Sequence, residues 1–194
     1  MNIFCRISMV LIISMSFTGC MTTASLNEQQ RPKQWATVLD QKTNLYQVSP
    51  WLYRSEQPSR DLIPALQHHQ IQTIINLRAR DTDTPQFSQQ ALNLVHVPIH
   101  TWSISRNDLL LVMKQLQKAQ AQHQNVLIHC YHGSDRTGAS IAMYRIIFEN
   151  WSKEEALAEM KYGGFGFHPI WINIETLFSP NNIRWIREQL TNPS

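Results

Sequence analysis

The chain has 194 residues and a mass of 22.6 kDa, which is enough for one ordinary domain with one hydrophobic core. Apolar residues make up 43% of it and charged residues 16%, a balance that excludes a disordered chain and a protein with several membrane spans. The formal net charge of +3 suits an anionic substrate but is too small to predict a nucleic-acid partner.

The N-terminus has the pattern of an export signal. Arg6 supplies a positive charge, and an uncharged apolar run extends from Ile7 to Phe17. This run is shorter than the roughly 20 residues that a membrane-spanning helix needs. It fits the apolar region of a secretory signal instead. We therefore expect residues 1–19 to be a signal peptide.

Small residues before Cys20 resemble the lipobox of bacterial lipoproteins, in which the cysteine is acylated and becomes the mature N-terminus. Phe17 stands where that box usually has an aliphatic residue, and an ordinary cleaved signal peptide is the alternative. On the lipoprotein interpretation, Cys20 carries lipid and residues 20–34 form a polar tether. No aspartate follows Cys20, which by resemblance to lipoprotein sorting patterns predicts a periplasmic protein anchored to the outer membrane.

The cysteines single out one thiol. The chain has three, of which Cys5 leaves with the signal and Cys20 would be lipidated. Cys130 then has no intramolecular partner. An unpaired cysteine in an exported protein is a candidate reactive thiol.

Residues 35–194 show the pattern of one folded domain in which strands alternate with helices. The expected strands are 51–54, 73–77, 94–99 and 126–129, and the expected helices are 59–69, 108–122, 137–148, one that follows a capping pair at Ser152 and Glu155, and 181–190. Such alternation predicts an α/β domain with a mostly parallel central sheet.

The stretch 126–138 carries the chemistry. The expected strand delivers Cys130 to a short loop that runs into a helix starting near Arg136 or Thr137. Backbone N–H groups of such a loop, with the positive end of the helix, form a concave anion site. Gly133 permits the backbone angles that turn these groups inward, and the planar guanidinium of Arg136 can bind two phosphate oxygens.

A thiolate at the floor of this site can attack phosphorus and form a phosphocysteine. The positive field stabilises the thiolate, and the loop with Arg136 stabilises the equatorial oxygens of the transition state. Thr137 can donate a hydrogen bond to the sulfur as it leaves in the second step. We expect no metal and no cofactor.

His-Cys-x5-Arg-Thr is the signature of the protein tyrosine and dual-specificity phosphatase superfamily. The chain resembles small bacterial dual-specificity phosphatases of the periplasm over residues 35–167, through LYRSEQPS (52–59), LVHVPI (94–99), HCYHGSDRTG (129–138), AMYRII (142–147) and the run 151–166. The resemblance implies their fold, an α/β domain with a central sheet of four or five strands flanked by helices. It also implies hydrolysis of phosphotyrosine, and of phosphoserine or phosphothreonine, in an envelope or membrane signalling protein.

The resemblance also implies roles for individual residues. Cys130 is then the nucleophile, Arg136 the phosphate binder, Thr137 the hydroxyl near the sulfur, and His129 tunes the thiol. The residues expected to contact substrate are His129, Tyr131, His132, Gly133, Ser134 and Trp102.

The proton donor is the point where the chain departs from the family. The family's aspartate lies on a loop after the strand equivalent to 94–99, and Trp102 stands at that place. Asp135 inside the loop is the first candidate, as in the phosphatases with a Cys-x4-Asp-Arg-Thr motif. Asp108, expected to cap a helix, is the second, and His100 is the third.

Other interpretations stay open at this stage. A metal site at His129, Cys130 and His132 is weaker because no fourth ligand is apparent. The remaining histidines, His168 among them, are expected on the surface or in the core. The functional alternatives are an inositol phosphate or phosphoinositide phosphatase, a catalytically impaired phosphopeptide-binding module and a sulfurtransferase. We expect a monomer that meets the membrane through its lipid anchor and does not bind nucleic acid.

Overall fold

The computed structural model describes residues 21–191. The expected signal peptide and the expected lipidation site, Cys20, lie outside the described residues. The strands are β1 (Thr37–Asp40), β2 (Leu45–Gln47), β3 (Leu52–Ser55), β4 (Ile71–Asn76), β5 (Asn93–His96) and β6 (Asn125–His129). The helices are η1 (Arg60–Leu62), α1 (Ile63–His68), α2 (Thr84–Phe87), η2 (Thr101–Ser103), α3 (Arg106–Ala121), α4 (Asp135–Phe148), α5 (Lys153–Tyr162), α6 (Ile172–Thr176) and α7 (Pro180–Thr191).

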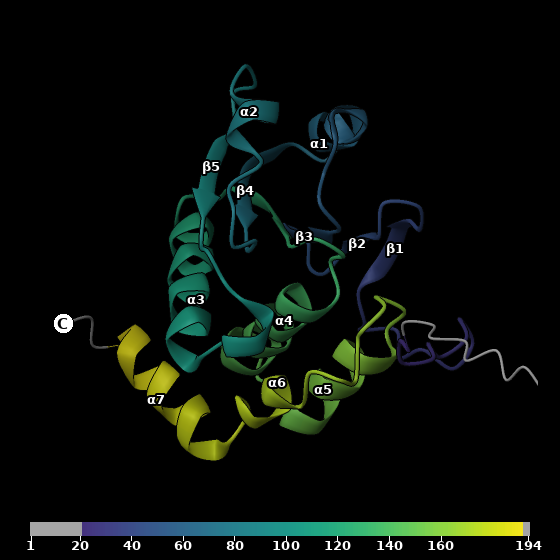
Figure 1. The fold of residues 1–194 in the computed structure, drawn as a ribbon, viewed down its shortest axis with the longest axis vertical. Coiled ribbons are helices and arrows are strands. Elements are labelled where there is room, and N and C mark those ends of the chain that lie inside the picture. Colours follow the sequence, from purple (N-terminus) through teal and green to yellow (C-terminus); the bar gives the residue numbers. More distant parts are fainter. Residues whose placement is uncertain (1–20, 192–194) are drawn as a thin grey trace, which may run out of the picture.

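The strands form one six-stranded sheet in the order β1-β2-β3-β6-β4-β5 (Figure 1). Strands β3, β6, β4 and β5 run parallel, whereas β1, β2 and β3 pair antiparallel. The predicted α/β fold with a mostly parallel sheet is confirmed. The sheet has more strands than the four or five expected, because the β1–β2 hairpin was not anticipated.

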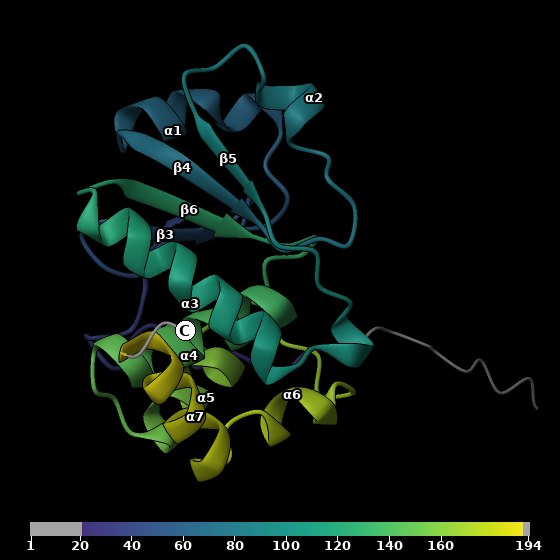
Figure 2. The ribbon, with the colours of Figure 1, turned by 90° about the vertical axis from the view of Figure 1, so that its left-hand side faces the viewer.

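Helices cover both faces of the sheet (Figure 2). Helices α1 and α2 lie on one face, over a small apolar cluster that includes Leu66, Ile74 and Phe87. Helices α3 and α4 lie on the other face, with α5 and α7 beyond, around the larger core. The central strand β6 is therefore covered on both sides, which explains its near-continuous apolar sequence.

Helix α4 is buried almost throughout, since it lies between the sheet and helices α3, α5 and α7. Helix α3 is amphipathic and begins with the capping box of Ser105 and Asp108. The predicted capping pair of Ser152 and Glu155 is confirmed at the start of α5.

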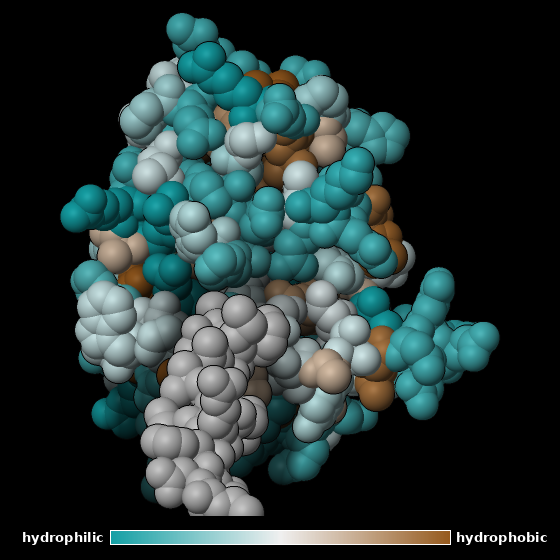
Figure 3. All heavy atoms as spheres, turned by 45° about the vertical axis from the view of Figure 1, so that its right-hand side comes forward, coloured by the Kyte–Doolittle hydropathy of each residue, from teal (hydrophilic) through white to brown (hydrophobic). Residues whose placement is uncertain are grey.

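The face drawn in Figure 3 is mostly hydrophilic, with apolar residues in small separate groups. Among residues 21–191, no helix combines the length and the apolar character needed to cross a membrane.

Part of the segment expected as a tether packs against the domain. The N–H of Thr23 donates to the carbonyl of Phe167 at 2.8 Å, and that of Leu26 donates to the carbonyl of Tyr162 at 3.0 Å. Ordered contacts of the domain therefore begin upstream of the boundary expected at residue 35.

Candidate active site

Cys130 lies at the edge of the sheet where three parallel strands end together. The strand register aligns Ser55 of β3 and Asn76 of β4 with His129 of β6, the residue before Cys130. Cys130 is 2% exposed and is the free cysteine of the described residues. The chain then enters α4 at Asp135. The predicted strand–loop–helix arrangement around Cys130 is confirmed.

Four consecutive carbonyl oxygens of the loop after β6 accept hydrogen bonds from the residues that surround the loop. These bonds fix the outer side of the loop. The four bonds join Cys130 O to His129 Nδ1 (3.1 Å), Tyr131 O to Gln57 N (3.0 Å), His132 O to Asn44 Nδ2 (2.8 Å) and Gly133 O to Arg54 Nη2 (2.6 Å). In a trans peptide the C=O and the following N–H point in opposite directions. The N–H groups of residues 131–134 therefore point to the inner side of the loop, where they can bind an anion. We call residues 130–136 the phosphate loop.

Gly133 cannot carry a side chain in this loop. Its φ of +72° lies in the left-handed region. A Cβ atom there would lie 2.4 Å from the carbonyl oxygen of Ser55 and 2.7 Å from the nitrogen of Glu56. Close contact with the backbone after β3 therefore requires glycine.

Arg54 places a buried positive charge beneath the phosphate loop. Its side chain is 1% exposed, and its Cζ lies 3.6 Å from the ring centroid of Phe165. Besides the bond to Gly133, its Nε and Nη1 atoms have no hydrogen-bond partner within residues 21–191. Burial lowers the pKa of Arg54 to about 10, while the negative charges of Glu159 and Cys130 act in the opposite direction. Arg54 is therefore charged at neutral pH.

Arg136 lies in the first turn of α4 and reaches the same edge of the sheet. Its Nη1 donates to the carbonyl of Ile99 at 3.0 Å and, more weakly, to that of Leu77 at 3.4 Å. Leu77 follows β4 and Ile99 lies beyond β5. These contacts hold the guanidinium at the carboxyl end of the sheet, the end that carries Cys130.

Asp135, the first candidate for the proton donor, is bonded to His168. Its Oδ1 accepts a hydrogen bond from the backbone N–H of His168 at 2.9 Å, and its Oδ2 lies 2.9 Å from His168 Nδ1. The Asp135 side chain is mostly buried, at 11% exposure. The sequence interpretation treated His168 as an ordinary surface or core residue and missed this pair.

Asp108, the second candidate, has the capping role expected of it. Its Oδ2 accepts hydrogen bonds of 2.8 Å from both the N–H and the Oγ of Ser105 at the start of α3. Trp102 lies in η2 and is 68% exposed, and its ring centroid is 4.6 Å from that of His100, the third candidate.

Aromatic and basic side chains gather around Tyr131 and His132 of the phosphate loop. Tyr131 is 54% exposed, and its ring meets that of His132 edge-on at 4.6 Å. The guanidinium of Arg78 lies 5.1 Å from the Tyr131 ring centroid, and the His132 ring lies 5.7 Å from that of His168. Such groups can contact an anionic or aromatic substrate at the entrance.

Two residues expected to contact substrate, His129 and Ser134, have buried side chains, so any contact of Ser134 with substrate goes through its backbone N–H. His129 is fully buried because β6 is covered on both faces, and its Nε2 lies 2.7 Å from Asp83 Oδ2. Ser134 is 1% exposed, and its hydroxyl is directed to Asp135 at 3.3 Å. Their side chains support the loop from beneath. Thr137 is also fully buried, and its hydroxyl has no hydrogen-bond partner in the described chain.

The supporting residues Asn44, Arg54, Gln57 and Asp83 were missed by the sequence interpretation. A charged residue within the short strand LYRS, after the apolar Trp51 and Leu52, was a signal for Arg54. The other three come from separate loops that only the fold brings together. Across residues 21–191, no group of three or more His, Cys, Asp or Glu side chains is arranged to hold a metal ion.

Comparison with known proteins gives consistent matches. The sequence model of the family "Dual specificity phosphatase, catalytic domain" matches residues 52–173. The dual specificity protein phosphatase TpbA of Pseudomonas aeruginosa is 35% identical over 161 residues, which are 83% of this chain and 73% of TpbA. A TpbA crystal structure superposes with a TM-score of 0.75 at 34% identity, covering 84% of this chain and 100% of that one.

Two further solved structures are similar to this chain. A cysteine-to-serine variant of P. aeruginosa TpbA in complex with pTyr has a TM-score of 0.75 at 33% identity, covering 84% of this chain and 99% of the other. The core catalytic domain of the PP-IP phosphatase SIW14 from S. cerevisiae has a TM-score of 0.62 at 20% identity, covering 76% and 93%. The second similarity shows the shared fold alone.

Proposed function

The chain belongs to the dual specificity phosphatases, and we propose that it hydrolyses phosphotyrosine in proteins through a phosphocysteine formed on Cys130. The pTyr complex of the TpbA variant supports this choice of substrate. The observation that carries the proposal is the phosphate loop, in which the carbonyls of residues 130–133 accept hydrogen bonds on the outer side, so that the N–H groups of residues 131–134 converge next to a buried thiol. Phosphoserine and phosphothreonine are further candidate substrates.

In the first step the Cys130 thiolate attacks phosphorus in line with the leaving oxygen. An S–P bond forms, the P–O bond to the tyrosyl oxygen breaks, and that oxygen takes a proton. The inward N–H groups and Arg136 stabilise the three equatorial oxygens, on which negative charge collects. In the second step water attacks phosphorus, the S–P bond breaks, and orthophosphate leaves with the thiolate restored.

We assign the proton donor to Asp135, with His168 as its partner. Asp135 adjoins Arg136 in the phosphate loop, and its carboxyl group is held by His168 at hydrogen-bond distance. The same carboxyl group would accept a proton from the attacking water in the second step. The buried hydroxyl of Thr137 lacks a partner in the described chain. We assign it to the departing sulfur, which would satisfy it.

Cys130→Ser tests the chemistry. The variant should lose hydrolysis of p-nitrophenyl phosphate, because an alcohol at neutral pH cannot replace a stabilised thiolate. It should still bind phosphate or vanadate, because the loop N–H groups remain. Substantial residual turnover by the variant would contradict the mechanism.

A substrate screen tests specificity. The purified domain would be assayed on a phosphotyrosine peptide, a phosphoserine peptide and an inositol phosphate. We expect kcat/KM to be highest for phosphotyrosine. A clear preference for the inositol phosphate would replace the proposed substrate, while loss of all turnover with retained phosphopeptide binding would indicate a binding module.

We further propose that the protein is a periplasmic lipoprotein, anchored through Cys20 to the outer membrane, that acts as a monomer on a phosphorylated envelope protein. The export pattern of residues 1–20 supports this location. Several acyl chains hold a protein on a membrane far better than one. Cys20→Ala should release the protein from the membrane fraction and prevent incorporation of radiolabelled palmitate. If the variant stays in the membrane fraction, the lipoprotein proposal is wrong. The protein then has a plain secretory signal or another anchor.

A further inference from the structure

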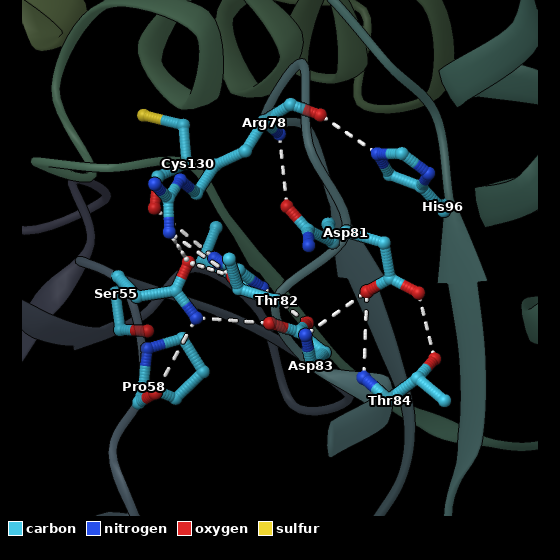
Figure 4. A network of polar contacts seen from close by, with 12 residues as sticks. Ser55, Pro58, Arg78, Asp81, Thr82, Asp83, Thr84, His96 and Cys130 are labelled. Atoms are coloured by element: carbon cyan, nitrogen blue, oxygen red, sulfur yellow. Dashed lines mark hydrogen bonds and ion pairs between the residues drawn. The ribbon is translucent and has the colours of Figure 1, made fainter. Parts of the chain in front are cut away.

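A chain of buried polar contacts runs from the loop after β4 to Cys130 (Figure 4). Asp83, 2% exposed, lies just before α2, and its Oδ2 is 2.7 Å from Nε2 of the fully buried His129. The other ring nitrogen of His129, Nδ1, is 3.1 Å from the carbonyl oxygen of Cys130. The imidazole therefore joins a buried carboxyl group to the first carbonyl of the phosphate loop.

The orientation of the neighbouring Gln57 fixes the role of one oxygen of Asp83, Oδ1. Arg78 Nη1 lies 2.9 Å from Gln57 Oε1, and a guanidinium can only donate. The amide nitrogen of Gln57 therefore faces Asp83 Oδ1, to which it donates at 2.9 Å. Asp83 Oδ1 is thus an acceptor, as expected of a carboxylate.

The protons of His129 follow from its two neighbours. A carbonyl oxygen only accepts, so Nδ1 carries a proton toward Cys130 O. When Asp83 is ionised, its Oδ2 also only accepts, so Nε2 carries the proton of this contact. In that state both ring nitrogens are protonated, and the positive charge of the imidazolium lies next to the nucleophile.

We propose that Asp83 is a positioning residue of the active site, which keeps His129 in the imidazolium form and so stabilises the Cys130 thiolate in the free enzyme. Asp83 touches neither substrate nor thiol and acts through His129. This inference deepens the proposed function and rests on it. It assigns a role to a residue outside the Cys-to-Arg motif that the sequence alone did not indicate.

Several other charged or titratable groups surround the pair. Arg78 and Asp81 belong to the loop after β4, and His96 at the end of β5 is bonded to the carbonyl of Arg78. The remaining groups are Arg54 of β3, Glu56 directly after that strand, and Cys130, Asp135 and Arg136 of the phosphate loop. None of them forms an ion pair with His129, whereas Asp83 does. The effect of removing the Asp83 charge should therefore be specific.

Asp83→Asn tests the proposal through a pH profile. An amide cannot stabilise the imidazolium, so the positive charge beside Cys130 is lost at neutral pH. The acidic limb of kcat/KM for p-nitrophenyl phosphate should move to higher pH by about one unit. Activity should fall about tenfold at the acidic end and change little on the alkaline plateau. A merely structural role would lower kcat/KM equally at every pH, and that result would overturn the proposal.

Asp81→Asn is the matched control. It removes the same charge two positions away, where Asp81 accepts hydrogen bonds from the N–H of Asp83 at 2.9 Å and from the hydroxyl of Thr84 at 2.7 Å. Its pH profile should keep the position of the wild-type limb. A shift as large as that of Asp83→Asn would attribute the effect to general charge and overturn the specific role.

A measurement on the wild-type protein tests the proposal even if the Asp83→Asn variant does not fold. The ¹⁵N shifts of labelled histidine, assigned with a His129→Gln variant, report whether Nε2 carries a proton. We expect both ring nitrogens of His129 to be protonated at pH 7.5. An unprotonated Nε2 would overturn the inference even if the enzyme is active, whereas an inactive wild-type enzyme with an intact imidazolium would contradict the proposed function instead.

Discussion

The guanidinium of Arg54 donates a hydrogen bond of 2.6 Å to the carbonyl oxygen of Gly133, which joins the end of β3 to the middle of the phosphate loop. The bond turns the peptide between Gly133 and Ser134 so that its N–H faces inward. The same guanidinium is buried and keeps its charge, because burial lowers the pKa of Arg54 only to about 10. Arg54 can therefore shape the loop and add positive potential near Cys130.

Arg54→Met should separate activity from stability. Loss of a hydrogen bond from a charged donor removes about 1.5 to 3 kcal/mol, so kcat/KM should fall about 10- to 100-fold. Stability should fall less, because the cost of leaving the Gly133 carbonyl without its donor is offset by removal of a buried guanidinium whose Nε and Nη1 have no partner in the described chain. Steady-state kinetics and thermal unfolding measure the two effects.

Arg106→Met is a suitable control for that experiment. Arg106 also stacks on an aromatic ring, with its Cζ 4.3 Å from the Trp185 centroid, but it lies at the exposed start of α3. Its removal should leave kcat/KM near the wild-type value. Equal kinetic losses in both variants would show that Arg54 has no special connection to the loop.

Gly133→Ala and Gly166→Ala should differ sharply in stability and in phosphate binding. Both glycines have positive φ, so an alanine costs about 1 kcal/mol or more at either position. A Cβ at Gly166 meets nothing within 4 Å, whereas at Gly133 it lies 2.4 Å from the backbone of Ser55. Urea unfolding should show the larger loss for Gly133→Ala, and only that variant should lose vanadate binding. Similar losses for the two would contradict the tight packing of the loop on β3.

The sequence predicted the parts of the fold that local pattern determines. Helix α3 and strand β6 have clear periodicity or a compact apolar run, and the motif around Cys130 is contiguous in the chain. The β1–β2 hairpin was missed because its strands are short and β1 is largely exposed. Asp83 could not be recognised as a partner of His129, because only the parallel pairing of β4 with β6 brings their carboxyl ends together.

Tyr144→Phe should reduce the loss of stability at alkaline pH. Burial raises the pKa of Tyr144 to about 12. The folded protein therefore holds the phenol proton more tightly than the unfolded chain, a stabilisation that is complete below pH 10 and is lost between pH 10 and 12. From pH 8 to pH 11 the free energy of unfolding of the wild type should fall about 1.4 kcal/mol more than that of the variant.

The Tyr144→Phe substitution removes the phenol hydroxyl and keeps the ring contacts of Tyr144. Its ring packs on Trp51 and Phe148 at centroid distances of 5.8 and 5.7 Å, contacts that a phenylalanine keeps. Tyr162→Phe makes the same change at a position that is 40% exposed. The two variants and the wild type would be unfolded with urea at both pH values. Parallel behaviour of Tyr144→Phe and the wild type would show that the Tyr144 phenol does not contribute.

Asp135→Asn should slow substrates according to their leaving group. A proton donor matters most when the leaving oxygen is strongly basic, so kcat for phosphotyrosine should fall by about 10²- to 10⁴-fold. The loss should be much smaller for an aryl phosphate whose leaving group needs no proton. His168→Ala removes the ring that lies 2.9 Å from Asp135 Oδ2 and should reproduce part of this selective loss.

The pattern of losses distinguishes a proton donor from a structural carboxylate. Asp135 also connects the phosphate loop to the backbone of His168, and a purely structural role would slow good and poor leaving groups equally. Asp108→Asn weakens only the cap of α3, which should cost about 0.5 kcal/mol of stability and little rate. A selective loss in Asp108→Asn, with Asp135→Asn unselective, would move the proton donor to the start of α3. Selectivity in Asp135→Asn alone would establish that the acid lies inside the phosphate loop, as expected from the sequence prediction that Trp102 stands at the place of the family's aspartate.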